Sequence, residues 1–366
     1  MYRTLKICLF LMSMAVAPYS SMMAGEPNVP QRSDAAPALA AGVACQNPLS
    51  PGDHEGPVPG WPNRDGLVHI PTSYDCRVPT PVVLVLHGGG SRKEDMRLLT
   101  CPDGDPDNPS CMDRLADREG FIVVYPDGTQ NYLWRTFNAT SKDTATQGRA
   151  VAADYACVSG YACTTGVDDI AYFSALLDEL ERVVNVDRSR VFATGISNGA
   201  AMAHRLACEM SDRIAAIAPV AGGNQFSVFH PCRPGRAVPV IEFHGTEDPS
   251  WGYGTPTTDT DLNGQGTVIS VSRTISGWVE RNGCYPVARS EALPDRDTTD
   301  DSTVTRVRYL GCENGADVEL YRINGGGHMW PDGFQWDVLF GQHGATNRDI
   351  NGNTVMWDFF RAHPLP

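Results

Sequence analysis

The stretch VFATGISNGAAM, residues 191–202, places a glycine-flanked serine between a strand pattern and a helix pattern. Val191–Ile196 is a β-rich apolar run, and Gly199–Met210 is an alanine-rich run with helical character. The pentapeptide between them is Gly-x-Ser-x-Gly, with Ser197 at its centre. In this setting the motif predicts a tight turn that exposes the serine where the strand ends. The amides that follow would lie at a helix N-terminus, whose partial positive charge suits an oxyanion.

Similar runs alternate along most of the chain. Continuous apolar runs are typical of strands buried on both faces of a parallel sheet. Strands are predicted at Val82–Leu86, Phe121–Tyr125, Val191–Ile196, Ile214–Val220, Val238–Phe243, Val304–Leu310 and Val318–Ile323. Helices are predicted at Asp168–Val184, Gly199–Met210, Val271–Arg281 and Asn353–Arg361. The alternation predicts one α/β domain, residues 61–366, with a doubly wound, mostly parallel sheet flanked by helices.

The N-terminal region carries the features of an export signal. Arg3 and Lys6 precede a short apolar run, and small residues follow, so residues 1–24 are predicted to be a signal peptide. Residues 25–60, rich in Ala, Pro, Gly and Asn, are predicted to be a poorly ordered leader. No run has the length of a transmembrane helix. We therefore expect a secreted or periplasmic protein.

The composition and net charge of the chain limit the kinds of partner that it can bind. The chain has 366 residues, 42% of them hydrophobic, and a formal net charge of −14. This charge argues against binding to nucleic acid or to an anionic membrane surface. We expect a monomer that acts on an ester substrate.

The cysteines suggest disulfides. One of the eleven lies in the signal, which leaves an even number in an exported chain. Spacing leaves the connectivity open; short loops favour Cys101–Cys111 and Cys157–Cys163. The remaining pairs that we expect are Cys208–Cys232, Cys284–Cys312 and Cys45–Cys76.

A serine nucleophile needs a base, and the base needs an acceptor that fixes its tautomer. In this fold the chain order is Ser, then Asp or Glu, then His. Asp248 follows the strand Val238–Phe243 and is the predicted acid, with Glu247 as the alternative. His328 follows three glycines after a late strand and is the predicted base.

Other histidines compete for the role of base. His87 and His244 end strands and suit structural hydrogen bonds, and His204 is expected on the flank of the helix after Ser197. The predicted oxyanion donors are the amides of Gly89 and Asn198, with Gly88 as the alternative to Gly89. No nucleotide-binding glycine motif occurs in the sequence.

Six motifs in order resemble the secreted polyhydroxybutyrate depolymerase and feruloyl esterase family. They are YPDG (125–128), VDDI (167–170), GISNG (195–199), APVAG (218–222), HGTED (244–248) and GHMWP (327–331). The resemblance implies an α/β-hydrolase fold and ester hydrolysis through an acyl-enzyme. It also implies that Ser197 is the nucleophile, Asp248 the acid and His328 the base. The cysteines near Cys208, Cys232, Cys284 and Cys312 are similar to family positions.

The substrate is less constrained. Depolymerases that attack granules commonly carry adsorption domains after the catalytic part, and the short stretch after His328 holds none. This favours soluble feruloyl esters or hydroxyalkanoate oligomers. Trp134, Trp251, Tyr253 and Trp330 are candidates for an aromatic pocket wall, with ordinary core packing as the alternative.

The sequence also bears on metal sites and on alternative functions. No catalytic metal is expected, because no HExxH or comparable spacing occurs. Structural calcium remains an option at Asp259–Gly264, which lacks the closing Glu, and at Asp103, Asp105 and Asp107. The alternative functions are a serine peptidase of related fold and a catalytically silent binding module.

Overall fold

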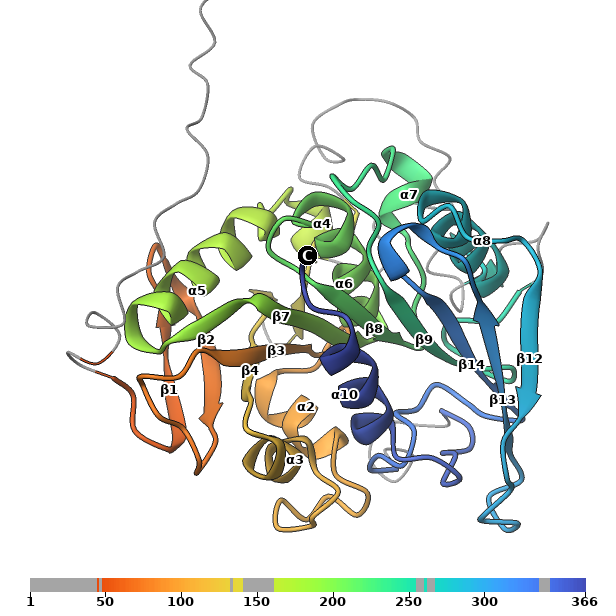
Figure 1. Ribbon diagram of the computed structural model, residues 1–366, viewed down its shortest axis with the longest axis horizontal. Helices are drawn as coiled ribbons and strands as arrows, with labels where there is room; N and C mark the ends of the chain where they lie inside the picture. The colour runs from red at the N-terminus through yellow and green to blue at the C-terminus, as the bar shows by residue number, and fades with distance from the viewer. Residues whose placement is uncertain are drawn as a thin grey trace, which may run out of the picture. The chain divides into compact units, whose positions relative to one another are not determined.

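The computed structural model describes residues 45, 48–131, 134–140, 161–254, 260–261, 267–335 and 343–366, all within the unit Leu39–Pro366. Their centre is a ten-stranded sheet of order β1-β2-β4-β3-β7-β8-β9-β14-β13-β12, with helices on both faces (Figure 1). Its strands are β1 (Gly52–Val58), β2 (Trp61–Ile70), β3 (Thr80–Leu86), β4 (Ile122–Pro126), β7 (Val186–Ile196), β8 (Ala216–Val220), β9 (Val240–Gly245), β12 (Ala288–Ala292), β13 (Thr303–Tyr309) and β14 (Val318–Asn324). The helices are α2 (Lys93–Leu99), α3 (Met112–Glu119), α4 (Tyr161–Thr164), α5 (Asp169–Val183), α6 (Asn198–Glu209), α7 (Phe226–Phe229), α8 (Val271–Arg281) and α10 (Gly352–Ala362). Two short hairpins complete the strands, β5 (Thr129–Asn131) with β6 (Trp134–Thr136) and β10 (Thr260–Asp261) with β11 (Thr267–Val268).

The middle of the sheet is parallel and its edges are antiparallel. β4, β3, β7, β8, β9 and β14 pair in parallel. On one side β2 and β1 continue the sheet antiparallel, and on the other side β13 and β12 do the same. The predicted α/β-hydrolase fold, a mostly parallel sheet flanked by helices, is therefore confirmed.

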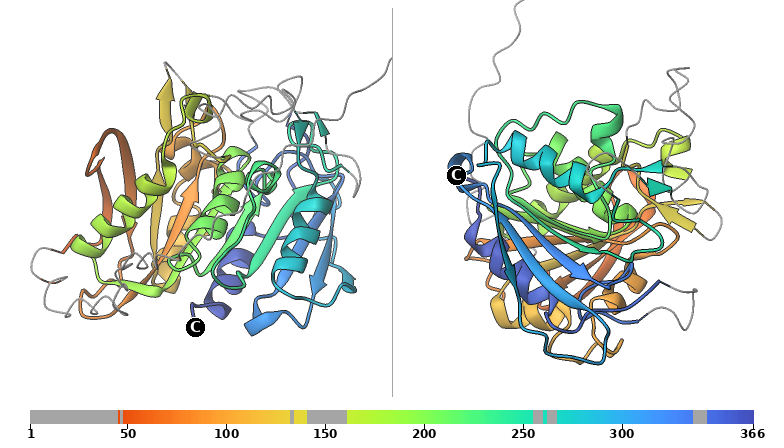
Figure 2. Two further views of the ribbon diagram at one scale, coloured as in Figure 1. Left: turned by 90° about the horizontal axis from the view of Figure 1, so that it is seen from above. Right: turned by 90° about the vertical axis from the view of Figure 1, so that its right-hand side faces the viewer.

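Each central strand contributes to two hydrophobic cores. In β3, Val82, Leu84 and Leu86 enter one core, while Val83 and Val85 enter the other, because successive side chains point to opposite faces. The first core also holds apolar residues of α5, α6 and α8; the second holds those of α2, α3 and α10. Figures 1 and 2 show these two groups of helices on opposite faces of the sheet. This double burial explains the continuous apolar runs of the sequence.

The edge strands were not predicted in full. The predicted leader, residues 25–60, overlaps β1, so this part of the leader prediction is wrong: the sheet already begins at Gly52. β1 pairs only with β2, and its Asp53, Glu55 and Gly56 are exposed, so it carries no apolar pattern. β12 was missed for the same reason. The predicted signal peptide, residues 1–24, lies outside the described residues.

The disulfides follow the expected pattern where they can be seen. Cys45–Cys76, Cys101–Cys111, Cys208–Cys232 and Cys284–Cys312 are bonded, which confirms four predicted pairs. The fifth pair, Cys157–Cys163, involves Cys157, which lies outside the described residues, and stays a prediction. Among the helices described, none is long and apolar enough to cross a membrane.

The topology brings distant loops to one place. β3, β7, β9 and β14 run parallel, so their carboxyl ends meet at a single edge of the sheet. The loops that follow these four strands begin at His87, Ser197, Thr246 and Gly325. Three of these loops contain the predicted nucleophile, acid and base.

Candidate active site

Ser197 occupies a sharp turn between β7 and α6. Its backbone has φ 57° and ψ −118°, a conformation that residues other than glycine rarely adopt. The flanking glycines permit the turn because a Cβ at Gly195 would lie 2.6 Å from the carbonyl oxygen of Leu86. At Gly199 a Cβ would collide with the same carbonyl and lie 2.6 Å from that of His87. The turn can therefore form only where β3 and α6 approach each other without side chains between them.

Asp248 and His328 form a hydrogen-bonded pair. Nδ1 of His328 lies 2.7 Å from Oδ2 of Asp248, whose side chain is fully buried. Oδ1 of Asp248 accepts hydrogen bonds from the amides of Ser250, at 2.8 Å, and Trp251, at 2.6 Å. Glu247, the alternative acid, is exposed. The structure thus places Asp248, and not its neighbour, against the imidazole.

The surroundings keep the Asp248 carboxyl ionised. Burial by itself would raise its pKa, but the charge of His328 and the hydrogen bond to that ring outweigh burial. His244 and the Trp251 amide lower the pKa further, so that it lies below its ordinary value. Because the carboxylate only accepts hydrogen bonds, Nδ1 of His328 donates to Asp248, and Nε2 is the ring nitrogen that does not contact this carboxylate.

Two neighbouring loops hold the imidazole over the sheet edge. The amide of His328 donates to the carbonyl of His343 at 2.6 Å, and the amide of Gly327 donates to Ala345 at 2.9 Å. From below, Gly245 packs so closely against the carbonyls of Gly326 and Gly327 that no Cβ would fit. Gly245 at the end of β9 and Gly327 in the loop therefore allow backbone to pack closely against backbone.

The loop after β3 presents backbone amides beside Ser197. Nε2 of His87 accepts from the amide of Gly128 at 2.9 Å, and Gly90 donates to the carbonyl of Arg135 at 2.9 Å. Burial lowers the pKa of His87 to about 3, so this ring is neutral, in keeping with a structural role. Within the described part of the chain, the amide of Gly89 makes no hydrogen bond. It is thus available to a ligand.

Asn198 has a second contact that sequence reasoning missed. Its side-chain oxygen accepts from the amide of Phe137 at 2.7 Å, and its side-chain nitrogen donates to the carbonyl of Phe137 at 2.9 Å. These two bonds attach the buried segment around Phe137 to the first residue of α6. The sequence offered one indication of this contact: the residue after Ser197 in the motif is a polar asparagine.

A single cavity connects these elements. It has a volume of about 340 Å³ and is lined by Ser197 and His328 together with the glycines of residues 88–90. Its other lining residues are apolar (Met96, Leu99, Ile196 and Met329) or polar (Ser91, Asp95, Ser250 and His343). The cavity lies at the small end of the range of roughly 300–1,000 Å³ that is typical of ligand pockets.

The predicted aromatic wall needs correction. Trp330 is completely buried, and its Nε1 donates to Oδ1 of Asn353 at 2.9 Å. Trp251 is also buried and donates to the carbonyl of Ile269 at 3.2 Å. Trp251 belongs to the first core and Trp330 to the second, so neither ring presents a surface to a ligand. Tyr253 is half-buried against the first core, and the side chain of Trp134 lies outside the described part of the structure.

His204 also differs from its expected position. It was expected on the flank of α6, but it is fully buried, and Trp278 donates to its Nδ1 at 3.0 Å. Burial lowers the pKa of His204 to about 3, so the ring is neutral.

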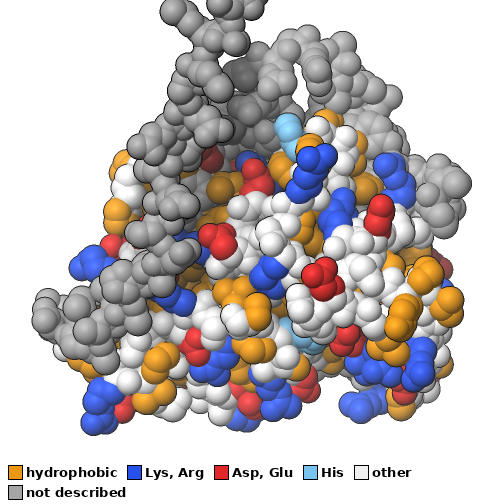
Figure 3. Space-filling view, turned by 45° about the horizontal axis from the view of Figure 1, so that its top comes forward, with side chains coloured by type: hydrophobic (Ala, Val, Ile, Leu, Met, Phe, Trp, Pro, Cys, Tyr) orange, Lys and Arg blue, Asp and Glu red, His pale blue; other side chains and the backbone are white. Residues whose placement is uncertain are grey.

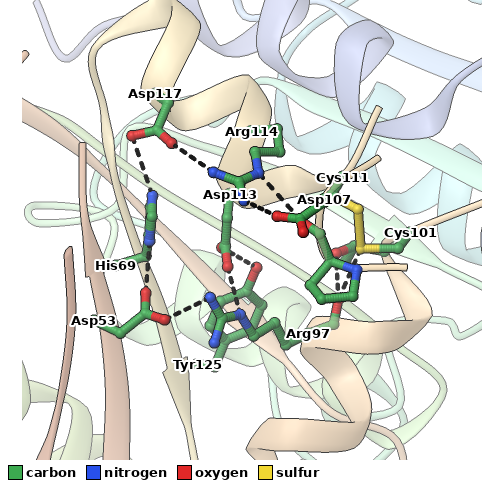
Figure 4. Close-up of polar contacts among 12 residues, drawn as sticks. Asp53, His69, Arg97, Cys101, Asp107, Cys111, Asp113, Arg114, Asp117 and Tyr125 are labelled. Atoms are coloured by element: carbon green, nitrogen blue, oxygen red, sulfur yellow. Dashed lines mark hydrogen bonds and ion pairs between the residues drawn. A yellow bond between two sulfur atoms is a disulfide. The ribbon is translucent and has the colours of Figure 1, made fainter. Parts of the chain in front are cut away.

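A polar cluster outside the pocket resembles a metal site but holds an arginine. One ligand atom each from Asp53, His69 and Asp113 lie within 4.8 Å of one another. The guanidinium of Arg97 bonds Asp53 at 2.7 Å and Asp113 at 2.5 Å (Figure 4). The hydroxyl of Tyr125 donates to Asp113 at 2.7 Å. The cation of this cluster is thus a side chain, which ties β1 and β2 to α2 and α3.

Of the two candidate calcium loops, the structure describes only the one with Asp103, Asp105 and Asp107 in full. Most of Asp259–Gly264 lies outside the described residues. In the other loop, Asp103 accepts from the amide of Asp105 at 3.0 Å, and Asp105 accepts from the amide of Asp107 at 2.9 Å. Asp107 pairs with Arg114. These carboxylates are engaged within the loop and its neighbouring helix.

Comparisons with known proteins point to esterases. No family model matches the chain. Feruloyl esterase B of Piromyces equi is 26% identical over 229 residues, which cover 62% of this chain and 37% of that enzyme. Feruloyl esterase D of Neurospora crassa is 29% identical over 306 residues, covering 81% of each. Among solved structures, an acetyl xylan esterase from Aspergillus awamori aligns over 82% of this chain and 94% of that one, with 16% identity and a TM-score of 0.49.

The chain thus spans little more than a third of the first relative and most of the second. Two feruloyl esterases among its relatives agree with the resemblance carried by the six motifs. In sequence the chain is similar to feruloyl esterases, and its fold is that of the α/β-hydrolases.

Proposed function

We propose that the protein is a carboxylic ester hydrolase that acts through an acyl-enzyme on Ser197. The observation that carries this proposal is the pocket in which Ser197, the hydrogen-bonded pair of His328 and Asp248, and an unbonded glycine amide meet. The esterase names of the relatives support the same class of reaction.

In the proposed first step, Nε2 of His328 takes the proton of Ser197 as the hydroxyl oxygen attacks the ester carbonyl. Asp248 stabilises the imidazolium that forms and keeps Nδ1 protonated throughout. His328 then gives its proton to the departing alcohol. In the second step the same nitrogen activates water, which releases the acid from Ser197.

The proposed oxyanion donors are the amides of Gly89 and Asn198. Gly89 lies in the loop after β3, and Asn198 is the first residue of α6, where backbone amides point along the helix axis with partial positive charge. The loss of one such donor costs about 10²–10³-fold in kcat in serine hydrolases. The bonds of the Asn198 side chain to Phe137 would keep the amide in place.

The proposed substrates are esters with a compact acyl group. The cavity of about 340 Å³ has four apolar side chains, which suits one aromatic ring or a short hydroxyalkanoate unit. The named relatives favour feruloyl esters over hydroxyalkanoate oligomers. On the face shown in Figure 3, acidic, basic and apolar side chains are interspersed.

Export is proposed as well. The predicted signal and the disulfides indicate a protein that folds outside the cytoplasm, in the periplasm or beyond the cell.

The test compares wild type with Ser197→Ala on methyl ferulate, 4-nitrophenyl acetate, hydroxybutyrate oligomers and a peptide anilide. We expect hydrolysis of the esters by wild type and a loss of at least about 10⁴-fold in the variant. Ser250→Ala is the matched control, because Ser250 also lines the pocket. Ester hydrolysis that survives in Ser197→Ala would contradict the proposal. Cleavage of the anilide alone would indicate a peptidase, and no reaction with a fluorophosphonate probe would indicate a binding module.

A further inference from the structure

A second set of buried ionisable groups contacts Asp248 from strand β9. Glu242 and His244 are two residues apart on this strand, so both side chains point to the same face of the sheet, and both are fully buried. Nδ1 of His244 lies 3.5 Å from Oε1 of Glu242, and Nε2 of His244 lies 3.4 Å from Oδ2 of Asp248. The reaction proposed above makes no use of either residue.

The contacts determine where the protons are. Nε2 of His244 lies 2.7 Å from the carbonyl oxygen of Trp251, which only accepts, so Nε2 carries a proton. His204 accepts from Trp278 at Nδ1, so its own proton is on Nε2, 3.7 Å from Oε2 of Glu242. Nδ1 of His244 faces Oε1 of Glu242 at 3.5 Å, so a second proton on this ring would place an imidazolium beside the Glu242 carboxylate.

Neither carboxylate oxygen of Glu242 has a hydrogen-bond partner among the described residues. A lone buried carboxylate is strongly unfavourable, so its charge must be balanced by a neighbouring group, and His244 lies 3.5 Å away. Burial raises the pKa of Glu242. Burial alone would lower the pKa of His244, but Glu242 and Asp248 together raise it. Two neighbouring carboxylates stabilise the protonated form of the His244 ring, the imidazolium.

We propose that His244 is a positioning residue for the Asp248–His328 pair: as an imidazolium balanced by Glu242, it holds Asp248 ionised and sets the pH at which the site becomes active. This inference rests on the proposed function. A positive charge beside Asp248 partly cancels the field of that carboxylate at His328. Without this charge, the acid limb of the activity profile would lie at a higher pH.

The other groups that face the cluster do not supply this charge. From α6 comes His204, which is neutral, and from the loop after β9 comes Tyr253, whose ring lies 6.0 Å from that of His244. Burial raises the pKa of Tyr253 to about 12, so it is neutral too. Two arginines lie on neighbouring elements: Arg281 of α8 lies 5.5 Å from the Trp278 ring, and Arg322 of β14 is paired in register with His244.

The decisive variant is Glu242→Gln, which keeps the shape but cannot balance an imidazolium. Because the removed carboxylate and the lost charge on His244 partly offset each other, we expect the acid limb of kcat/KM to move upward by on the order of 0.5 pH unit. His244→Gln should move it in the same direction. The assay is hydrolysis of 4-nitrophenyl acetate by the full chain between pH 4 and pH 9.

His69→Gln is the matched control. His69 is also a buried imidazole between two carboxylates, 2.7 Å from Asp53 and 3.4 Å from Asp117, but it lies on β2 and does not line the pocket. A merely structural role of Glu242 would lower stability or kcat and leave the acid limb where it is. An unmoved limb in Glu242→Gln would therefore overturn the proposal.

A spectroscopic readout is independent of catalysis. In protein labelled with ¹⁵N in its histidine rings, the signals of His244, assigned by their absence in His244→Gln, should show an imidazolium at pH 7. In Glu242→Gln they should show a neutral ring. A neutral ring in wild type overturns the proposal even if Glu242→Gln does not fold. If Ser197→Ala still hydrolyses esters, the proposed function fails, yet this spectrum still reports the charge on His244.

Discussion

Replacing Asp248 with Asn changes one atom at the centre of the site and leaves its surroundings in place. The amides of Ser250 and Trp251 donate to Oδ1, at 2.8 and 2.6 Å, and an asparagine oxygen can accept both bonds. The altered atom is the one 2.7 Å from Nδ1 of His328, where an NH₂ group replaces a carboxylate oxygen. The variant therefore isolates the effect of this single contact.

An NH₂ group only donates, so Nδ1 of His328 would have to accept, and its proton would move to Nε2. A protonated Nε2 cannot take the proton of Ser197. In Ser-His-Asp triads this exchange lowers kcat by about 10⁴-fold, or about 5.5 kcal/mol of activation free energy. We expect a loss of this order for Asp248→Asn on 4-nitrophenyl acetate at pH 8, with little change in KM.

Stability gives an independent measurement on the same variant. Because the folded-state pKa of Asp248 lies below its ordinary value, the carboxylate stabilises the fold above the unfolded-state pKa of about 3.9. This contribution is lost as the pH falls through the folded-state pKa. The difference in unfolding free energy between wild type and Asp248→Asn, measured in urea, should therefore shrink as the pH is lowered from 5 to 3. A folded variant within tenfold of wild-type kcat would refute the reasoning.

Two further changes test the packing around the pocket. Gly199→Ala places a methyl group 2.6 Å from the carbonyl of His87, so we expect a loss of about 1–3 kcal/mol in urea unfolding, whereas Gly56→Ala, with nothing within 4 Å, should be nearly neutral. Trp330→Phe removes the hydrogen bond to Asn353, so we expect a loss of about 1–3 kcal/mol of stability and an unchanged KM for methyl ferulate. A higher KM at unchanged stability would instead show that Trp330 contacts the substrate.

The meeting of Asp248 and His328 could be predicted from the sequence because each follows the end of a strand pattern in a parallel sheet. Strands buried on both faces can be recognised in the sequence as continuous apolar runs, and the carboxyl ends of parallel strands lie at the same edge of the sheet. The order Ser197, Asp248, His328 then leaves few pairings open. The structure adds the distances between side chains, such as the 2.7 Å between Nδ1 of His328 and Oδ2 of Asp248, which residue spacing in the sequence cannot give.

The aromatic residues show where this reasoning stops. Trp330 is only two residues from His328, but closeness in sequence does not say where a side chain points in an irregular loop. Its indole needs a hydrogen-bond acceptor, and Asn353 of α10 supplies one within the core. The edge strands β1 and β12 escaped prediction for a related reason, since a strand paired on one side and exposed carries no apolar pattern.

Glu242 is the residue from which the buried charged group beside Asp248 could have been predicted. It stands in the run Val-Ile-Glu-Phe-His-Gly, residues 240–245, where every residue is buried. A carboxyl group in a strand covered on both faces is expensive, so such a residue needs a nearby proton or cation. His244 offers one on the same face of the strand, and the other nitrogen of its ring faces Asp248. The cost of burying Glu242 is thereby coupled to the charge at the site, which gives a physical reason for a glutamate in the core of the sheet.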